Sequence, residues 1–184
     1  MPVFPNLFLN RANLRSRPAR SVVLCLLLAG VTARGVSQDA PVNPPQKLDG
    51  YLQVDFARLA DFKIDVPGFD PEVKPAAALA AVEKQLPESV RALDGQPAQI
   101  SGFMLPVKMD GMRVKEFLLM RSQMMCCYGV VPRMNEWVIV RAASTVKFTP
   151  DVPTAFRGKL RVKPMEDQGF LTGVYLLEDA GPGK

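Results

Sequence analysis

The second half of the chain is a series of short apolar segments separated by turn signals, and this series most constrains the fold. In the clearest segment, Leu160 and Val162 alternate with basic residues, as on a strand with one buried face. Five segments are predicted to be strands: 99–107, 114–120, 136–142, 156–163 and 171–177. Asp110-Gly111, between the first two, is a strong hairpin signal. Five short strands predict a small five-stranded antiparallel barrel, OB-like by preference, with a roll or an open meander as the alternative.

One helix is predicted ahead of these strands, over residues 75–86. This stretch is rich in alanine, begins with proline, and places Leu79, Val82 and Leu86 at helical spacing. The predicted fold class is therefore mainly β with an N-terminal helix (α+β).

Residues 49–64 leave the type of element open. Val54 and Phe56 continue an alternating pattern that favours a strand, whereas Phe56, Leu59 and Phe62 have the spacing of one helical face. Both alternatives stand at the level of sequence.

Residues 1–37 have the pattern of a signal peptide. Four arginines without any acid precede an apolar run, Ser21 to Val31, which is too short for the roughly 20 residues of a spanning helix. Cleavage is predicted after Ser37, with Ala33 as the competing site and an uncleaved N-terminal anchor as the alternative. The sequence thus predicts an exported, periplasmic or secreted protein.

The remaining boundaries follow from composition. Residues 38–48 are predicted to be a linker, 49–179 a single exported domain, and 180–184 a flexible tail, because both end segments are rich in polar residues, proline or glycine.

The formal charge of the chain, +5, comes from the leader. The chain has 23 basic and 18 acidic residues, and residues 1–37 contain five arginines and no acid, so 18 of each sign remain. A domain without net charge removes the main electrostatic argument for nucleic-acid binding, and no nucleic-acid partner is predicted.

The chain has no histidine, which excludes Ser–His–Asp and Cys–His catalysis and histidine zinc sites. It also lacks a glycine-rich phosphate loop and a dinucleotide fingerprint. We therefore predict no catalytic and no cofactor-binding residues, and a non-enzymatic protein.

The candidate site is the adjacent pair Cys126-Cys127, preceded by Met124 and Met125; the third cysteine, Cys25, lies in the leader. Thiolate and thioether ligands favour Cu(I), and zinc would need further ligands. Alternatively, a strained and easily reduced disulfide between the neighbours would suit a redox or switch role. A third alternative is a purely structural loop with small buried residues.

Three motifs resemble one bacterial family. They are Gly102-Phe103-Met104-Leu105-Pro106, then Glu116-Phe117-Leu118-Leu119, then Cys126-Cys127-Tyr128-Gly129 with Pro132 and Asn135 at fixed spacing. Together, over residues 50–179, they are similar to an exported family of domains of unknown function, number 3299.

The resemblance implies a periplasmic or lipid-anchored accessory protein, in some cases beside transporters linked to metal supply. Other members have one cysteine followed by histidine, whereas this chain has the vicinal pair and no histidine. The expected partner is thus a protein of unknown identity, a membrane transporter being one candidate, with membrane contact only through an uncleaved leader.

Overall fold

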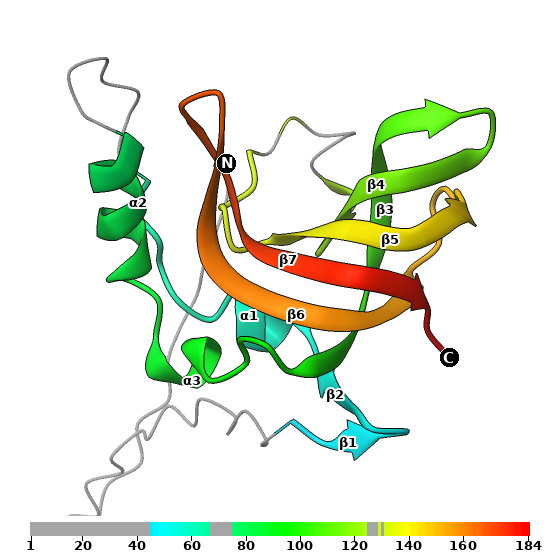
Figure 1. Cartoon of the computed structure of the whole chain (residues 1–184), viewed down its shortest axis with the longest axis horizontal. Helices are drawn as coiled ribbons and strands as arrows, with labels where there is room; N and C mark the ends of the chain where they lie inside the picture. Colours follow the sequence, from blue (N-terminus) through cyan, green and yellow to red (C-terminus); the bar gives the residue numbers. More distant parts are fainter. Residues whose placement is uncertain (1–44, 67–74, 125–128, 130) are drawn as a thin grey trace, which may run out of the picture. The chain divides into compact units, whose positions relative to one another are not determined.

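The strands of the domain wrap around one another in the computed structural model, which describes residues 45–66, 75–124, 129 and 131–184 (Figure 1). All of these belong to one compact unit, Ala40–Lys184. The predicted leader and most of the predicted linker lie outside the described residues. The strands are β1 (Lys47–Leu48), β2 (Tyr51–Val54), β3 (Pro97–Asp110), β4 (Arg113–Met120), β5 (Trp137–Lys147), β6 (Thr154–Asp167) and β7 (Phe170–Pro182). The helices are α1 (Phe56–Leu59), α2 (Pro75–Glu83) and α3 (Glu88–Arg91). Within this part of the chain, no helix has the length and apolar character needed to cross a membrane.

The fold is mainly β, with a closed five-stranded barrel and few helices. The barrel strands follow one another in the order β3, β4, β5, β7, β6, and β3 pairs with β6 to close the circle. β2 pairs in parallel with the first part of β3, and β1 lies outside β2. The prediction of a mainly β fold with a small five-stranded barrel is therefore confirmed.

The prediction that the barrel is purely antiparallel is wrong at one pair. β5 and β7 run parallel, with Ile139 opposite Leu176 and Val140 opposite Leu177. The reason is the closure itself: β6 crosses to pair with β3, so β7 returns into the space beside β5 and runs in the same direction. No local pattern encodes such a long-range pairing.

The flexible tail predicted over 180–184 differs from the structure, because β7 continues to Pro182. Ala180 is buried, and the N–H of Gly183 donates to the carbonyl oxygen of Ala155 at 2.7 Å. The Gly/Pro composition suggested fraying, but pairing with β6 satisfies the backbone of this segment.

The open question over residues 49–64 is resolved by a change of element within the segment. β2 ends at Val54, and Asp55 then caps α1 by accepting a hydrogen bond from the N–H of Arg58 at 2.9 Å. The helix predicted over 75–86 corresponds to α2, which ends at Glu83 and packs against β6.

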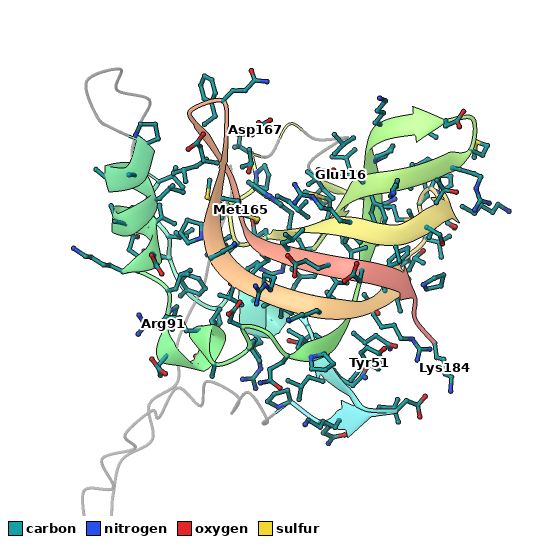
Figure 2. All side chains as sticks on the ribbon, viewed as in Figure 1. Tyr51, Arg91, Glu116, Met165, Asp167 and Lys184 are labelled. Atoms are coloured by element: carbon teal, nitrogen blue, oxygen red, sulfur yellow. The ribbon has the colours of Figure 1, made fainter. Side chains whose placement is uncertain are left out.

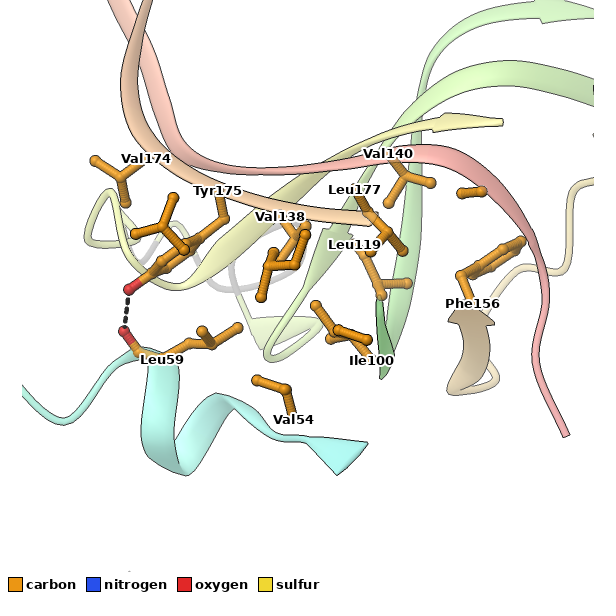
Figure 3. Close-up of a cluster of buried hydrophobic side chains, with 14 of the residues drawn as sticks. Val54, Leu59, Ile100, Leu119, Val138, Val140, Phe156, Val174, Tyr175 and Leu177 are labelled. Atoms are coloured by element: carbon orange, nitrogen blue, oxygen red, sulfur yellow. Dashed lines mark hydrogen bonds between the residues drawn. The ribbon is translucent and has the colours of Figure 1, made fainter. Parts of the chain in front are cut away.

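The interior of the barrel is apolar, and Phe117, Phe156 and Tyr175 are its largest fully buried side chains. Figure 3 shows Phe156 and Tyr175 among the buried side chains. The rings of Phe117 and Phe156 meet at a tilt, with centroids 4.8 Å apart. The Tyr175 hydroxyl donates to the carbonyl oxygen of Leu59 at 2.7 Å, which ties α1 across one end of the barrel. Burial raises the pKa of this phenol above its ordinary value.

Candidate functional site

The site predicted from sequence lies in the long connection between β4 and β5. Cys126, Cys127 and Met125 are outside the described residues. Met124 is described: its side chain is 53% exposed, and its N–H donates to the Ser122 hydroxyl at 3.2 Å. The described residues contain no group of three or more His, Cys, Asp or Glu side chains placed to hold a metal ion.

The two ends of this connection are held together. Met120 pairs with Trp137, and the N–H of Arg121 donates to the carbonyl oxygen of Glu136 at 3.0 Å. The Glu136 carboxylate also accepts hydrogen bonds from the Arg121 guanidinium at 3.1 Å and from both the N–H and the guanidinium of Arg133, at 3.0 and 3.1 Å. The connection is therefore a closed loop with a charged clamp at its base.

The clamp also sets the ionisation of Glu136. Partial burial acts to raise the pKa of its carboxyl, but the backbone and side-chain hydrogen bonds from Arg133, its charge and the bond from Arg121 outweigh this and lower the pKa below the ordinary value. The carboxylate is thus held in its charged form.

The same loop end is anchored to the segment that follows α1. Asn135 is fully buried, and its amide donates to the carbonyl oxygen of Phe62 at 2.8 Å, while the Arg133 guanidinium donates to that of Ala60 at 3.1 Å. These side chains satisfy carbonyl groups left unpaired past a helix end. The base of the loop and the segment after α1 consequently form one hydrogen-bonded corner.

Trp137 begins β5 directly after this corner. Its indole N–H donates to the carbonyl oxygen of Thr172 at 3.1 Å, and the half-buried ring packs against the core. Gly173 eases this approach, because a Cβ there would make a tight contact of 3.2 Å with the indole nitrogen.

A second candidate site lies on the outer face of the barrel, where two cavities adjoin. One has a volume of about 510 Å³ and lies beside the β3–β4 hairpin; the other, of about 710 Å³, extends across β4, β5 and β7 to β6. Both are lined by Val107, Glu116 and Arg141. These shared residues make the two cavities a single groove, called the barrel-face groove below.

The floor of the groove is an apolar row. Leu118 lies opposite Ile139 on the neighbouring strand, and Ile139 lies opposite Leu176 on the next. All three line the larger cavity, because they share the outward face of successive strands.

Charged side chains of both signs surround this floor. Glu116 and Arg141 are paired residues of β4 and β5, with 3.6 Å between carboxylate and guanidinium. Glu178 is 3.3 Å from Arg161. The charges on the strands are therefore neighbours of opposite sign, while the end of β6 adds Glu166 and Asp167 beside Lys163.

The two walls of the groove are hairpins. One is the β3–β4 hairpin; the other is the β6–β7 hairpin, where Gln168 and Gly169 both have positive φ. Figure 2 shows Glu116 on β4 and Met165 and Asp167 near the end of β6, which line opposite sides of the larger cavity. A register irregularity between Val162 and Met165 bends this wall.

The sequence did not point to the groove. Its floor residues lie on three strands that are neighbours only after the barrel closes. A usable signal was present in the motif Glu116-Phe117-Leu118-Leu119, where Phe117 and Leu119 face the core and Leu118 faces outward.

Comparison with known proteins supports the resemblance seen in the sequence. A family model described as "Protein of unknown function (DUF3299)" matches residues 59–180. A crystal structure of a DUF3299 family protein from Pseudomonas aeruginosa PAO1 is similar at 20% identity and a TM-score of 0.47, covering 72% of this chain and 95% of that one. A search of curated proteins finds no significant match. Because the family model spans more than half of the sequence, the chain belongs to the DUF3299 family.

Proposed function

We propose that this is an exported, non-enzymatic binding protein of the periplasm, whose ligand lies in the barrel-face groove. The observation that carries the proposal is the adjoining pair of cavities that share Val107, Glu116 and Arg141. Their volumes are in the range of small-molecule sites in proteins. Export is supported by the basic and apolar pattern of residues 1–37.

The proposal includes an OB-like barrel. Ligands of OB-folds bind on the face of the second and third strands, between the loop joining strands one and two and the loop joining strands four and five. The corresponding parts here are β4, β5 and the hairpins β3–β4 and β6–β7. The order of the strands and the position of the groove both support this assignment.

The lining selects the chemistry of the ligand. Leu118 is half-buried and offers the main apolar contact, above Ile139 and Leu176, which are buried. At the hairpin wall, the side chains of Lys108 and Lys115 make no hydrogen bond or ion pair with the described residues. A small ligand with an apolar part and one anionic group therefore suits the groove better than a polyanion does. Its anionic group is expected at the hairpin end, because Glu166, Asp167 and Glu178 line the other end.

The fluorescent probe 8-anilinonaphthalene-1-sulfonate, which is apolar and anionic, tests the groove directly. We expect saturable binding at one site of the folded protein, weakened at least tenfold (about 1.4 kcal/mol) in Leu118→Lys, because a charge would interrupt the apolar floor.

Val152→Lys is the matched control, since Val152 is 53% exposed and lines neither cavity. Both variants carry the same added charge and are checked by circular dichroism. Equal binding by the two variants would place the probe elsewhere and refute the groove.

A second proposal concerns the Cys126-Cys127 loop, which we propose as a soft-metal site that takes copper or zinc, with Met124 and Met125 as further ligands. The exposed thioether of Met124 supports it, because this ligand is accessible next to the pair. In this form the protein would deliver or hold metal for a partner such as a membrane transporter.

Cu(I) titration of the reduced protein tests the metal proposal. We expect one tightly bound ion, lost in Cys126→Ser/Cys127→Ser and weakened in Met124→Leu. Met112→Leu, which changes another exposed methionine, is expected to leave binding unchanged. Undiminished binding by the double serine variant would contradict the proposal.

Intact mass under non-reducing conditions separates the redox alternative. A Cys126–Cys127 disulfide lowers the mass by about 2 Da relative to the free thiols and would favour the redox or switch role. Free thiols that react only after denaturation would favour the purely structural role.

A further inference from the structure

The turn end of the β3–β4 hairpin carries apolar side chains that are exposed to solvent. Residues 107–113, called the hairpin tip below, are all exposed. Val107 is 63% exposed, Met109 41% and Met112 56%. The backbone at the tip is nevertheless held, because the N–H of Phe148 donates to the carbonyl oxygen of Met112 at 2.8 Å. The apolar side chains are thus presented on an ordered support.

Basic side chains surround these apolar ones. Lys108 and Arg113 lie within the tip, Lys115 follows it, and Lys147 of β5 lies opposite Arg113 in the register. Among these positions the one acid is Asp110, while the next acid along β4, Glu116, is paired with Arg141. Residues 38–184 carry equal numbers of basic and acidic residues, so the hairpin tip is a local positive surface on a neutral domain.

Exposed methionine and valine ringed by lysine and arginine match the two requirements of an anionic bilayer surface. The apolar side chains enter the boundary between headgroups and acyl chains, and the basic side chains lie at the phosphates. A stable protein interface usually takes about 20–30 residues on each partner, whereas the hairpin tip, 107–113, has seven.

We propose that the hairpin tip docks the protein on an anionic phospholipid bilayer. This goes beyond the proposed ligand binding. The tip also forms one wall of the smaller cavity, but the residues tested below, Met112 and Lys147, line neither cavity of the groove, so the two proposals are tested separately. Docking would hold the groove, which the same hairpin walls, close to the membrane surface.

The test is sedimentation of the protein, purified from the export compartment, with vesicles of equimolar phosphatidylglycerol and phosphatidylcholine, and with vesicles of phosphatidylcholine alone. We expect binding to the anionic vesicles that falls when salt is raised to about 0.5 M, where screening is strong. In Met112→Asp/Lys147→Glu, the partition coefficient is expected to fall at least about tenfold, because an apolar anchor is lost and a charge is reversed.

Leu48→Asp/Lys47→Glu is the matched control, because it makes the same two changes at exposed positions of β1. It is expected to bind within twofold of the unchanged protein. All proteins compared have the same N-terminus, confirmed by mass, so any contribution of an uncleaved leader cancels. Circular dichroism checks folding, and Met112→Ser/Lys147→Ser, a milder pair, is expected to lose about threefold.

Three outcomes would overturn the proposal. The first is equal binding of the protein to both kinds of vesicle. The second is an equal loss of binding in the tip variant and the control variant. The third is displacement of the protein from the anionic vesicles by poly-L-glutamate as effective as displacement by an excess of unsedimented anionic vesicles. The last would assign the hairpin tip to an acidic protein partner.

Discussion

Glu136 joins the two ends of the β4–β5 loop through hydrogen bonds from Arg121 and Arg133. The side chains of the nearby Asn135 and Arg133 instead donate hydrogen bonds to backbone carbonyl oxygens more than 70 residues earlier in the chain. Single side chains therefore decide how the base of the cysteine loop is attached to the barrel.

The stability of the clamp is expected to depend on pH through Glu136. Because its pKa is lowered in the folded state, its contribution is present above the unfolded value near 4.5 and is lost as pH falls through the lower folded value. Glu136→Gln should therefore lose about 1–2 kcal/mol at pH 7 and less below pH 4. Urea unfolding at several pH values measures this, with the exposed pair member Glu88→Gln as control. Parallel pH curves for Glu136→Gln and the unchanged protein would contradict the argument.

Tyr175 also connects distant parts of the chain, because its hydroxyl donates a hydrogen bond to the carbonyl oxygen of Leu59, 116 positions earlier. Tyr175→Phe leaves the Leu59 carbonyl unpaired at a buried position and should lower the free energy of unfolding by about 1–3 kcal/mol. Tyr51→Phe, at a half-buried ring that faces Arg157, should change it by less than about 0.5 kcal/mol. Similar losses in the two variants would show that the hydroxyl bond is unimportant.

At the scale of elements, β6 crosses β7 so closely that only glycine fits at position 158. A Cβ there would lie 2.5 Å from the carbonyl oxygen of Glu178 and 3.1 Å from Leu177 Cγ. The register is irregular at this point, between Arg157 and Lys159. The pairing of β6 with β7 therefore depends on a residue without a side chain.

Gly158→Ala is expected to destabilise the protein by about 1–3 kcal/mol, since backbone must move to admit the methyl group. Gly181→Ala, on the partner strand, meets nothing within 4 Å and should change stability by less than about 0.5 kcal/mol. Thermal and urea unfolding of both variants test the comparison. If Gly158→Ala matched Gly181→Ala, the close crossing of β6 and β7 would not limit stability.

At the scale of the molecule, the barrel closes through pairings between distant segments. β3 pairs with β6, and β5 pairs in parallel with β7. Such contacts must overcome the entropy of closing long loops before they stabilise the fold.

Refolding should accordingly be slow, on the order of milliseconds to seconds. Trp137 reports it directly, because it is the one tryptophan of the chain and its indole contacts β7. Stopped-flow fluorescence would measure the rate. Complete recovery within microseconds would contradict a closure-limited mechanism.

Local patterns in the sequence specify most of the strands and the β3–β4 hairpin, because alternation and turn residues act between near neighbours. Val114, Leu160 and Val162 face inward as their pattern indicates, and Asp110-Gly111 lies at the turn. The parallel pairing of β5 with β7 and the extension of β7 to Pro182 are visible in the folded barrel alone. The same holds for the single floor that Leu118, Ile139 and Leu176 form. Each of these depends on which strands become neighbours, and strand neighbours are chosen by the closure of the whole barrel, which no stretch of the sequence encodes alone.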